Sequence, residues 1–261
     1  MELQIKEKNG FNYVDEGAGE VLLLLHGLFG ALSNWEDVVR EFSSDYRVII
    51  PLLPIYEMPL SKAGVPGLMN YVEDFLAALS LTEPATVLGN SLGGHVALVY
   101  TLRNPGRVKR LVLTGSSGLF EDSMGGSFPK RGNYAFVQER VGYTFYDPTL
   151  ATKELVDEVF NVTNSNAKCL RIISIARSAQ RHNLSKDLSG IKVPTLLVWG
   201  LNDTITPPPV AHEFNRLIAG SELRFLDHCG HAPMMERPRE FNAYLRQFLR
   251  HPVPQPAVAG A

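Results

Sequence analysis

The fold of this chain is decided by the stretch Ala85-Thr86-Val87-Leu88-Gly89-Asn90-Ser91-Leu92-Gly93-Gly94. Its first four residues form an apolar run typical of a buried strand, and residues 95–103 have the composition of a helix. Between strand and helix stands the motif Gly-x-Ser-x-Gly, which makes a sharp turn that strains the serine backbone. The glycines allow neighbouring chain segments to approach closely. The stretch therefore predicts that the Ser91 hydroxyl is presented at the end of a strand.

Ser91 stands where a nucleophile can be helped by the backbone. The N–H of Leu92 and the dipole of the following helix can stabilise an oxyanion that forms beside the serine. The motif alone is weak evidence, because chance supplies it in roughly one chain in ten of this length. The function therefore depends on whether the other groups that a reactive serine needs are also in the sequence.

Composition indicates a soluble globular protein with one large domain, or one domain that carries an insertion. The chain has 261 residues, of which 45% are hydrophobic and 20% charged. A net charge of −2 gives no reason to expect nucleic acid or an anionic membrane surface as a partner. The charged N-terminus lacks the apolar segment of a signal peptide, and no apolar run approaches the ~20 residues of a membrane span. We expect a cytoplasmic protein, and the oligomeric state stays open.

Strand-like and helix-like segments alternate along most of the chain. Two short strands around Asn9-Gly10 are predicted to form a hairpin. Residues 21–25 are a continuous apolar run typical of a parallel strand covered on both faces, and further strands are predicted at residues 47–51, 85–88, 108–114, 193–200 and 222–226. Helices are predicted after several of these strands, at about 34–42, 70–79, 95–103, 210–218 and 238–249. This alternation predicts the α/β class, with a mostly parallel, doubly wound sheet of about eight strands.

The alternation stops after Gly118 and resumes near residue 193. The intervening residues contain helix-like segments at about 133–142, 151–160 and 166–181, and we interpret them as an inserted helical cap. The predicted division is a core of residues 1–118 and 189–250, a cap of 119–188 and a flexible tail of 251–261. Aromatic side chains of the insertion either form its own small core or make an apolar roof over a substrate pocket. The residues expected to bind substrate are Phe29, Phe120, Met124, Phe128 and Phe136.

A serine nucleophile needs a histidine base and a carboxylate that orients it. Among the seven histidines, His231 follows the last predicted strand and lies after the serine in the chain, as the base of such a sheet should. His228 is the nearest rival, while His95 is interpreted as packed against the sheet and His182 as a surface residue.

Asp203 is the expected acid, because it follows the strand at 195–200 in a proline-stiffened loop. Asp227 is the alternative acid, but it lies too close to His231 in sequence. Besides Leu92, the second N–H of the oxyanion hole is expected from Leu28, which follows His26-Gly27, with Phe29 as the fallback. We interpret His26 as a residue that holds this loop by hydrogen bonds.

Four motifs together resemble the α/β-hydrolase fold family, in the branch with a helical cap between the sixth and seventh strands. They are His26-Gly27-Leu28-Phe29-Gly30, Gly89-Asn90-Ser91-Leu92-Gly93-Gly94, Val198-Trp199-Gly200-Leu201-Asn202-Asp203 and Gly230-His231-Ala232-Pro233 with Glu236-Arg237-Pro238. The resemblance extends from residue 22 to about 249. It implies Ser91 as nucleophile, Asp203 as acid and His231 as base, with no metal and no organic cofactor.

The loop after the strand at 47–51 departs from the family pattern. Members usually carry an acidic residue and a Gly-x-Gly turn with serine there, whereas this chain has Pro51-Leu52-Leu53-Pro54-Ile55-Tyr56-Glu57-Met58-Pro59. The loop borders the active-site side of the predicted sheet. Substrate preferences of the commoner members therefore transfer poorly to this chain.

The leading functional hypothesis is a serine hydrolase for carboxylic esters of small to medium apolar substrates. The second hypothesis is hydrolysis of a carbon–carbon bond, because Gly89-Asn90-Ser91 also resembles the meta-cleavage-product hydrolases. Arg171, Arg177 and Arg181 could then bind a dienoate carboxylate, although the aromatic residue that this subgroup often carries after the base is absent. A third hypothesis, from a different class, is a ligand receptor of the same fold that binds without turnover or hydrolyses slowly.

Overall fold

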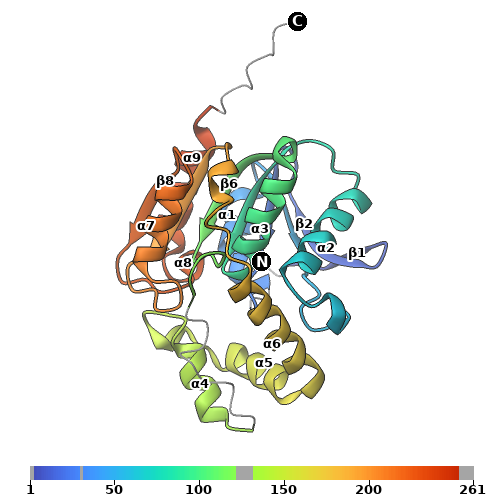
Figure 1. Ribbon diagram of the computed structural model, residues 1–261, viewed down its shortest axis with the longest axis vertical. Helices are drawn as coiled ribbons and strands as arrows, with labels where there is room; N and C mark the ends of the chain where they lie inside the picture. The colour runs from blue at the N-terminus through green and yellow to red at the C-terminus, as the bar shows by residue number, and fades with distance from the viewer. Residues whose placement is uncertain (1–2, 30–31, 122–131, 253–261) are drawn as a thin grey trace, which may run out of the picture.

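A single twisted sheet forms the centre of the molecule (Figure 1). The computed structural model describes residues 3–29, 32–121 and 132–252. The sheet order is β1-β2-β4-β3-β5-β6-β7-β8, with β1 and β2 antiparallel and all neighbours from β4 to β8 parallel. The strands are β1 (Lys6–Lys8), β2 (Phe11–Glu16), β3 (Val21–Leu25), β4 (Arg47–Pro51), β5 (Ala85–Asn90), β6 (Val108–Thr114), β7 (Thr195–Gly200) and β8 (Glu222–Leu226). The predicted α/β class and mostly parallel sheet are confirmed.

Helices cover both faces of this sheet. The α-helices are α1 (Glu36–Phe42), α2 (Val65–Ala78), α3 (Leu92–Arg103), α4 (Tyr134–Gly142), α5 (Lys153–Asn164), α6 (Asn166–Arg181), α7 (Pro208–Leu217), α8 (Pro233–Glu236) and α9 (Pro238–Arg250). Short 3₁₀ turns are η1 (Leu32–Trp35), η2 (Leu60–Lys62), η3 (Pro105–Arg107), η4 (Pro148–Leu150) and η5 (Leu188–Gly190). Buried side chains of α2, α3 and α7 pack on one face, and those of α1 and α9 on the other.

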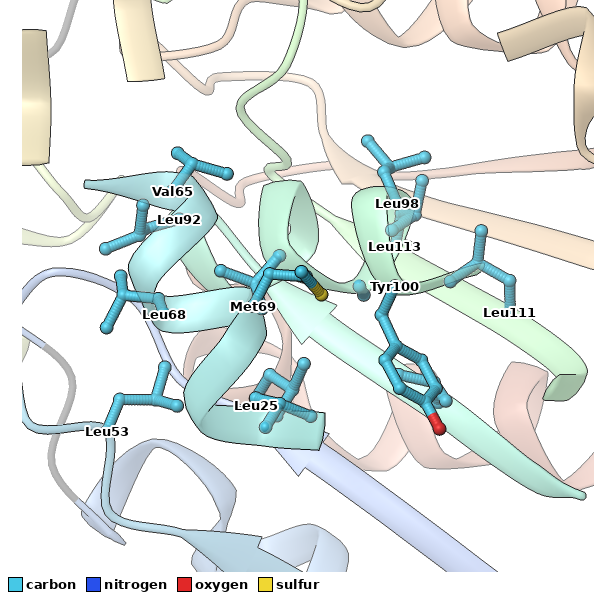
Figure 2. Close-up of a cluster of buried hydrophobic side chains, with 14 of the residues drawn as sticks. Leu25, Leu53, Val65, Leu68, Met69, Leu92, Leu98, Tyr100, Leu111 and Leu113 are labelled. Atoms are coloured by element: carbon cyan, nitrogen blue, oxygen red, sulfur yellow. The ribbon is translucent and has the colours of Figure 1, made fainter. Parts of the chain in front are cut away.

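The apolar run of β3 contributes side chains to two hydrophobic cores, one on each face of the sheet. Leu23 and Leu25 belong to the core under α2 and α3, whereas Leu22 and Leu24 belong to the core under α1 and α9. Successive side chains of a strand point to opposite faces, so a strand covered on both sides needs an unbroken apolar run. Figure 2 shows Leu25 in the first core, together with Leu68 and Met69 of α2 and side chains of α3 and β6. Complete burial of each leucine stabilises the fold by about 1.5–3 kcal/mol.

The N-terminal hairpin follows the turn chemistry that its sequence predicts. Asn9 and Gly10 have φ angles of 53° and 80°. Two successive positive φ angles are those of a type I′ turn, which matches the twist of an antiparallel pair. The hairpin attaches to the sheet through β2, which pairs with β4.

Helix α2 begins five residues before the predicted start at residue 70. Pro66 and Gly67 read as loop residues in the sequence, yet both lie in the first turn of α2. Proline is tolerated there because its missing N–H would have no partner within the helix. Gly67 is required by close packing, since a Cβ at this position would lie 2.0 Å from the Lys62 carbonyl oxygen.

Helices α4, α5 and α6 follow one another between β6 and β7 and form a group below the sheet in Figure 1. We call this group the helical insertion. The Leu184 N–H donates to the Gly118 carbonyl oxygen over 2.8 Å, so the insertion leaves and rejoins the rest of the chain at one place. Met124 and Phe128 lie outside the described residues, as does most of the predicted tail. Across the described parts of the chain, every helix is too short or too polar to span a bilayer.

Candidate active site

Ser91 occupies a strained corner between β5 and α3. Its backbone has φ 54° and ψ −120°, a conformation that a residue with a side chain rarely adopts. The two flanking glycines make the corner possible. A Cβ at Gly93 would lie 2.1 Å from the Leu25 carbonyl oxygen, and one at Gly89 would lie 2.5 Å from the Gly93 carbonyl oxygen. The motif therefore produces the strain that its sequence predicts, and it presents Ser91 at the N-terminus of α3.

The loop after β3 lies beside Ser91 and is held by His26. A Cβ on Gly27 would lie 3.2 Å from the Ser91 Cβ, so only glycine fits at this approach without displacement. His26 Nδ1 donates to the Gly27 carbonyl oxygen over 2.9 Å, and its Nε2 accepts the Leu53 N–H over 3.0 Å. Burial lowers the pKa of His26 and keeps the ring neutral, as the accepting Nε2 requires. Both ring nitrogens are thus used in holding the loop.

Asp203 and His231 form a buried pair behind Ser91. His231 Nδ1 lies 2.9 Å from Asp203 Oδ2, and both side chains are almost fully buried. The N–H groups of Ile205 and Thr206 donate to Asp203 Oδ1 over 2.8 and 2.9 Å, and the Thr206 hydroxyl donates to Oδ2 over 2.9 Å. The carboxylate is fixed by four directional contacts, so it can orient the imidazole.

The second ring nitrogen of His231 is the one that can take up a proton. His231 Nε2 is buried and makes no hydrogen bond to any described residue, while Nδ1 is occupied by Asp203. Burial works to lower the pKa of His231, but the charge and hydrogen bond of Asp203, with Glu121 and Glu236, raise it overall. The site therefore favours an imidazolium that forms when Nε2 takes up a proton.

Two hydrogen bonds, one from β5 and one to the helical insertion, fix the backbone of His231. The Asn90 side-chain amide donates to the carbonyl oxygens of Thr114 and His231 over 3.0 and 3.1 Å. The His231 N–H donates to the Thr144 carbonyl oxygen of the helical insertion over 2.8 Å. A buried amide at the end of β5 is a signal that sequence reasoning could have used, because Asn90 must find partners inside the protein.

Glu236 ties the histidine loop to the insertion. Its Oε1 accepts the N–H groups of Gly230 and Ala232 over 2.9 and 3.2 Å, and its Oε2 accepts the Tyr146 N–H over 2.7 Å. Burial raises the pKa of Glu236, whereas these three N–H groups oppose that rise. The glutamate therefore joins the residues on both sides of His231 to the loop that follows α4 in the insertion.

A cavity of about 520 Å³ lies between the helical insertion and the carboxyl ends of the strands. Ser91, Leu92, His231, Leu28 and Phe29 line its floor. The insertion supplies an apolar wall that consists of Phe136, Val137, Val141, Phe145, Leu155, Val159, Ile175, Ala176 and Ala179. The structure thus brings most of the residues predicted for catalysis and binding to one enclosed space.

Phe120 is a correction to the predicted substrate-binding residues. Its side chain is 59% exposed and does not line the cavity among the described residues, whereas Phe136 does. The neighbouring Leu119 packs on the core, and Glu121 is the residue of this segment that faces the cavity. Gly118 has a φ angle of 117°, so the chain turns at this residue. Composition alone does not reveal which of the following side chains then face the cavity.

Two charged residues that the sequence analysis missed also line the cavity. Glu121 accepts a hydrogen bond from the Ser117 hydroxyl, and burial raises the pKa of its carboxyl group. The Arg140 guanidinium lies 5.1 Å from the ring centre of Phe136 and 5.3 Å from that of Tyr143. A mainly apolar space thus carries one acid facing His231 and one base on α4.

The other candidate residues lie elsewhere. His228 and Asp227 are exposed and 3.1 Å apart. His182, which was predicted to lie at the surface, is partly exposed, and its Nδ1 lies 3.0 Å from Nε2 of the buried His95. Arg171 donates to the Met58 carbonyl oxygen over 2.7 Å, and the arginine found among the described cavity residues is Arg140. Within the described residues, no three His, Cys, Asp or Glu side chains gather as metal ligands.

Comparison with known proteins agrees with this geometry. Residues 22–244 match the model of the alpha/beta hydrolase family. The chain belongs to this family. The predicted α/β-hydrolase fold is therefore confirmed, and the protein is an enzyme of the hydrolase class.

Relatives of this α/β-hydrolase differ in the activities that their names describe. A 2-hydroxy-6-oxo-2,4-heptadienoate hydrolase of Pseudomonas putida is 29% identical, over 91% of this chain and 92% of the relative. Lipase 1 of Psychrobacter immobilis is 27% identical, over 86% and 75% of the two chains. The crystal structure of MGS-MChE2, an alpha/beta hydrolase from a Moroccan lagoon sediment metagenome, is 39% identical with a TM-score of 0.78, and covers 95% and 98% of the chains.

Proposed function

We propose that this enzyme hydrolyses carboxylic esters of small to medium apolar substrates through an acyl-enzyme intermediate. Ser91 is the nucleophile, His231 the general base and Asp203 the residue that orients His231. The observation that carries the proposal is the Asp203–His231 hydrogen bond, which leaves His231 Nε2 as the proton acceptor in the cavity that Ser91 lines. Relatives that include a lipase support ester chemistry.

In the first half of the reaction, the Ser91 hydroxyl oxygen bonds to the ester carbonyl carbon while its proton moves to His231 Nε2. The carbonyl oxygen becomes an oxyanion, which the N–H groups of Leu28 and Leu92 stabilise. Leu92 is the first residue of α3, so its N–H points out of a helix end that favours negative charge. The tetrahedral intermediate collapses, the bond to the alcohol oxygen breaks, and His231 Nε2 gives its proton to the departing alcohol.

In the second half, water attacks the carbonyl carbon of the acyl-enzyme. His231 Nε2 takes the proton from this water, and a second oxyanion forms in the same place. Collapse of this intermediate breaks the bond to Ser91, and the proton returns from His231 to the serine oxygen. The products are a carboxylic acid and an alcohol. Asp203 stabilises the imidazolium in both halves and does not itself take up the proton.

The cavity walls support an apolar and uncharged acyl group. Aliphatic and aromatic side chains from α4, α5 and α6 form most of the wall, so we propose that the helical insertion acts as a cap over Ser91. The Glu121 carboxyl group faces His231 and raises its pKa. A substrate carboxylate near the reacting bond would meet this negative charge, which favours a neutral ester.

Hydrolysis of a carbon–carbon bond is the second candidate. Arg140 favours it, because a guanidinium in the cavity can pair with the carboxylate of a dienoate. The 29% identity to a 2-hydroxy-6-oxo-2,4-heptadienoate hydrolase points the same way. Arg140 belongs to α4, so the carboxylate would have to bind on the insertion side of the cavity.

Purified enzyme should be assayed with p-nitrophenyl esters from acetate to decanoate and with a 2-hydroxy-6-oxo-dienoate. Ester turnover that depends on chain length and disappears in Ser91→Ala supports the proposal. Ser189→Ala is the control, because Ser189 is exposed on η5 and is not among the residues that line the cavity. Turnover of the dienoate without ester turnover would overturn the proposal in favour of the second candidate.

A further inference from the structure

Residues 52–64, which connect β4 to α2, form hydrogen bonds to the loop after β3 and to the helical insertion. Its sequence departs from the family pattern, so no role is carried over from relatives. The Tyr56 hydroxyl donates to the Leu28 carbonyl oxygen over 3.1 Å, and the Leu53 N–H donates to His26 Nε2 over 3.0 Å. The segment therefore touches the loop that supplies the first oxyanion donor at two places.

The same segment is fastened to α6 of the helical insertion. Arg171 Nε donates to the Met58 carbonyl oxygen over 2.7 Å, and the Ser174 hydroxyl donates to the Ala63 carbonyl oxygen over 2.8 Å. The Lys168 ammonium lies 5.6 Å from the ring centre of Tyr56. Lys168, Arg171 and Ser174 follow at intervals of three, so they lie along one side of α6.

Because a peptide unit is planar, a hydrogen bond to its carbonyl oxygen also limits the direction of its N–H. In a trans peptide the C=O and the N–H point opposite ways, and the described residues contain no cis peptide bond. Tyr56 holds the oxygen of the Leu28–Phe29 peptide, and His26 holds the oxygen of the Gly27–Leu28 peptide. Two successive peptide planes are thus fixed. The plane that His26 holds carries the N–H of Leu28, and the plane that Tyr56 holds carries the N–H of Phe29 and limits rotation about the Leu28 backbone.

The hydrogen bond that the Tyr56 hydroxyl donates to Leu28 should not depend on pH. Burial raises the pKa of Tyr56 above its ordinary value, and Glu158 and Glu57 raise it further. The phenol therefore stays protonated over the pH range in which a hydrolase works. Its ring is half-buried and packs on the core of the sheet.

We propose that Tyr56 is a positioning residue of the oxyanion hole. By holding the Leu28–Phe29 peptide it limits rotation of Leu28, whose N–H binds the oxyanion, and it ties this loop to α6. This inference rests on the proposed role of Leu28 in stabilising an oxyanion. Tyr56 does not line the cavity among the described residues, so it acts through the loop and not on the substrate.

Tyr56→Phe tests the proposal, because it keeps the ring and removes only the hydroxyl. We expect kcat to fall about 10-fold with little change in KM, less than the ~10²–10³ that follows loss of a whole oxyanion donor. The matched control is Tyr134→Phe. The Tyr134 hydroxyl donates to the Asp157 carboxylate over 2.7 Å, a hydrogen bond between α4 and α5 that involves neither residues 52–64 nor the loop after β3. Its kcat should stay within about twofold of the wild-type value, since no donor moves.

A second measurement separates positioning from a general loss of structure. An alkyl boronic acid forms a tetrahedral adduct with the serine, and its inhibition constant should weaken in Tyr56→Phe by the same factor as kcat. The carboxylic acid product should inhibit both proteins equally. A lower melting temperature with unchanged kcat, or equal kcat losses in Tyr56→Phe and Tyr134→Phe, would overturn the proposal.

Failure of this inference can be told apart from failure of the proposed function. The comparison uses whichever substrate, ester or dienoate, the wild-type enzyme hydrolyses with dependence on Ser91. If wild type turns over and Tyr56→Phe equals it, only the positioning role is wrong. If wild type hydrolyses neither substrate class, both the function and this inference are contradicted.

Discussion

The two sides of the cavity are built by different kinds of interaction. On the strand side, Asp203 receives four hydrogen bonds and His231 is held through its backbone and ring, so atoms are fixed in direction. On the insertion side, the wall consists mainly of aliphatic side chains that fill space without preferred direction. We infer that catalysis depends on the directions in which hydrogen bonds hold Asp203 and His231. Substrate choice depends instead on the shape and volume of the cavity.

The largest effect should come from a substitution that disturbs the hydrogen bonds on the strand side of the cavity. Asp203→Asn should lower kcat by about 10⁴-fold, because an amide favours the wrong tautomer of His231. The fold should persist, which circular dichroism and the melting temperature can check. Asp227→Asn is the control, since this exposed carboxylate contacts His228 and not His231. Activity close to wild type in Asp203→Asn would place the acid elsewhere.

A change on the space-filling side should alter selectivity and leave the chemistry intact. Ala176→Leu adds bulk to the cavity wall from α6. Loss of room for one or two methylene groups costs about 0.8–1.6 kcal/mol, so kcat/KM for octanoate should fall about 4- to 15-fold relative to acetate. Ala167→Leu, on the exposed surface of the same helix, should leave this ratio unchanged. Equal losses for acetate and octanoate would show that the wall also positions the catalytic groups.

The smallest effect concerns Glu121, which belongs to the cavity but acts through charge. Its carboxylate stabilises the protonated form of His231 and so raises the pKa of that ring. His231 must be neutral to act as base, and Glu121→Gln lowers its pKa. The acid limb of the kcat/KM profile should therefore move to lower pH, with the plateau value retained. Glu158→Gln, on α5, is a control that should not move this limb. A shift to higher pH would contradict the assigned charge interaction.

Strands were the part of the fold that sequence predicted best. The segment 21–25 is β3 itself, because a strand buried on both faces needs an uninterrupted apolar run, and the segments predicted at 108–114 and 222–226 are β6 and β8. Helix beginnings were harder. The start of α2 at Val65 was missed because Pro66 and Gly67 normally indicate a loop, and only the packing against Lys62 explains them.

For the candidate site, local motifs led to Ser91 and His231, and the structure places both at one cavity. Groups that act through tertiary contact left no local signal. Tyr56 and Thr206 matter because of what lies next to them in space, and Glu121 faces the cavity because of the turn at Gly118. Their catalytic or positioning roles stay predictions until the variants are measured.

The hydrogen bond between Leu184 and Gly118 has a consequence for how this enzyme can change. Because the insertion departs and returns through a single narrow neck, its length and composition can vary while β6 and β7 keep their places. We expect that exchange of the segment between these two residues changes specificity, provided that the new segment keeps the contacts of the insertion to His231, Glu236 and residues 52–64. Grafts from relatives should join at this neck, provided that they keep an N–H for the Gly118 carbonyl oxygen.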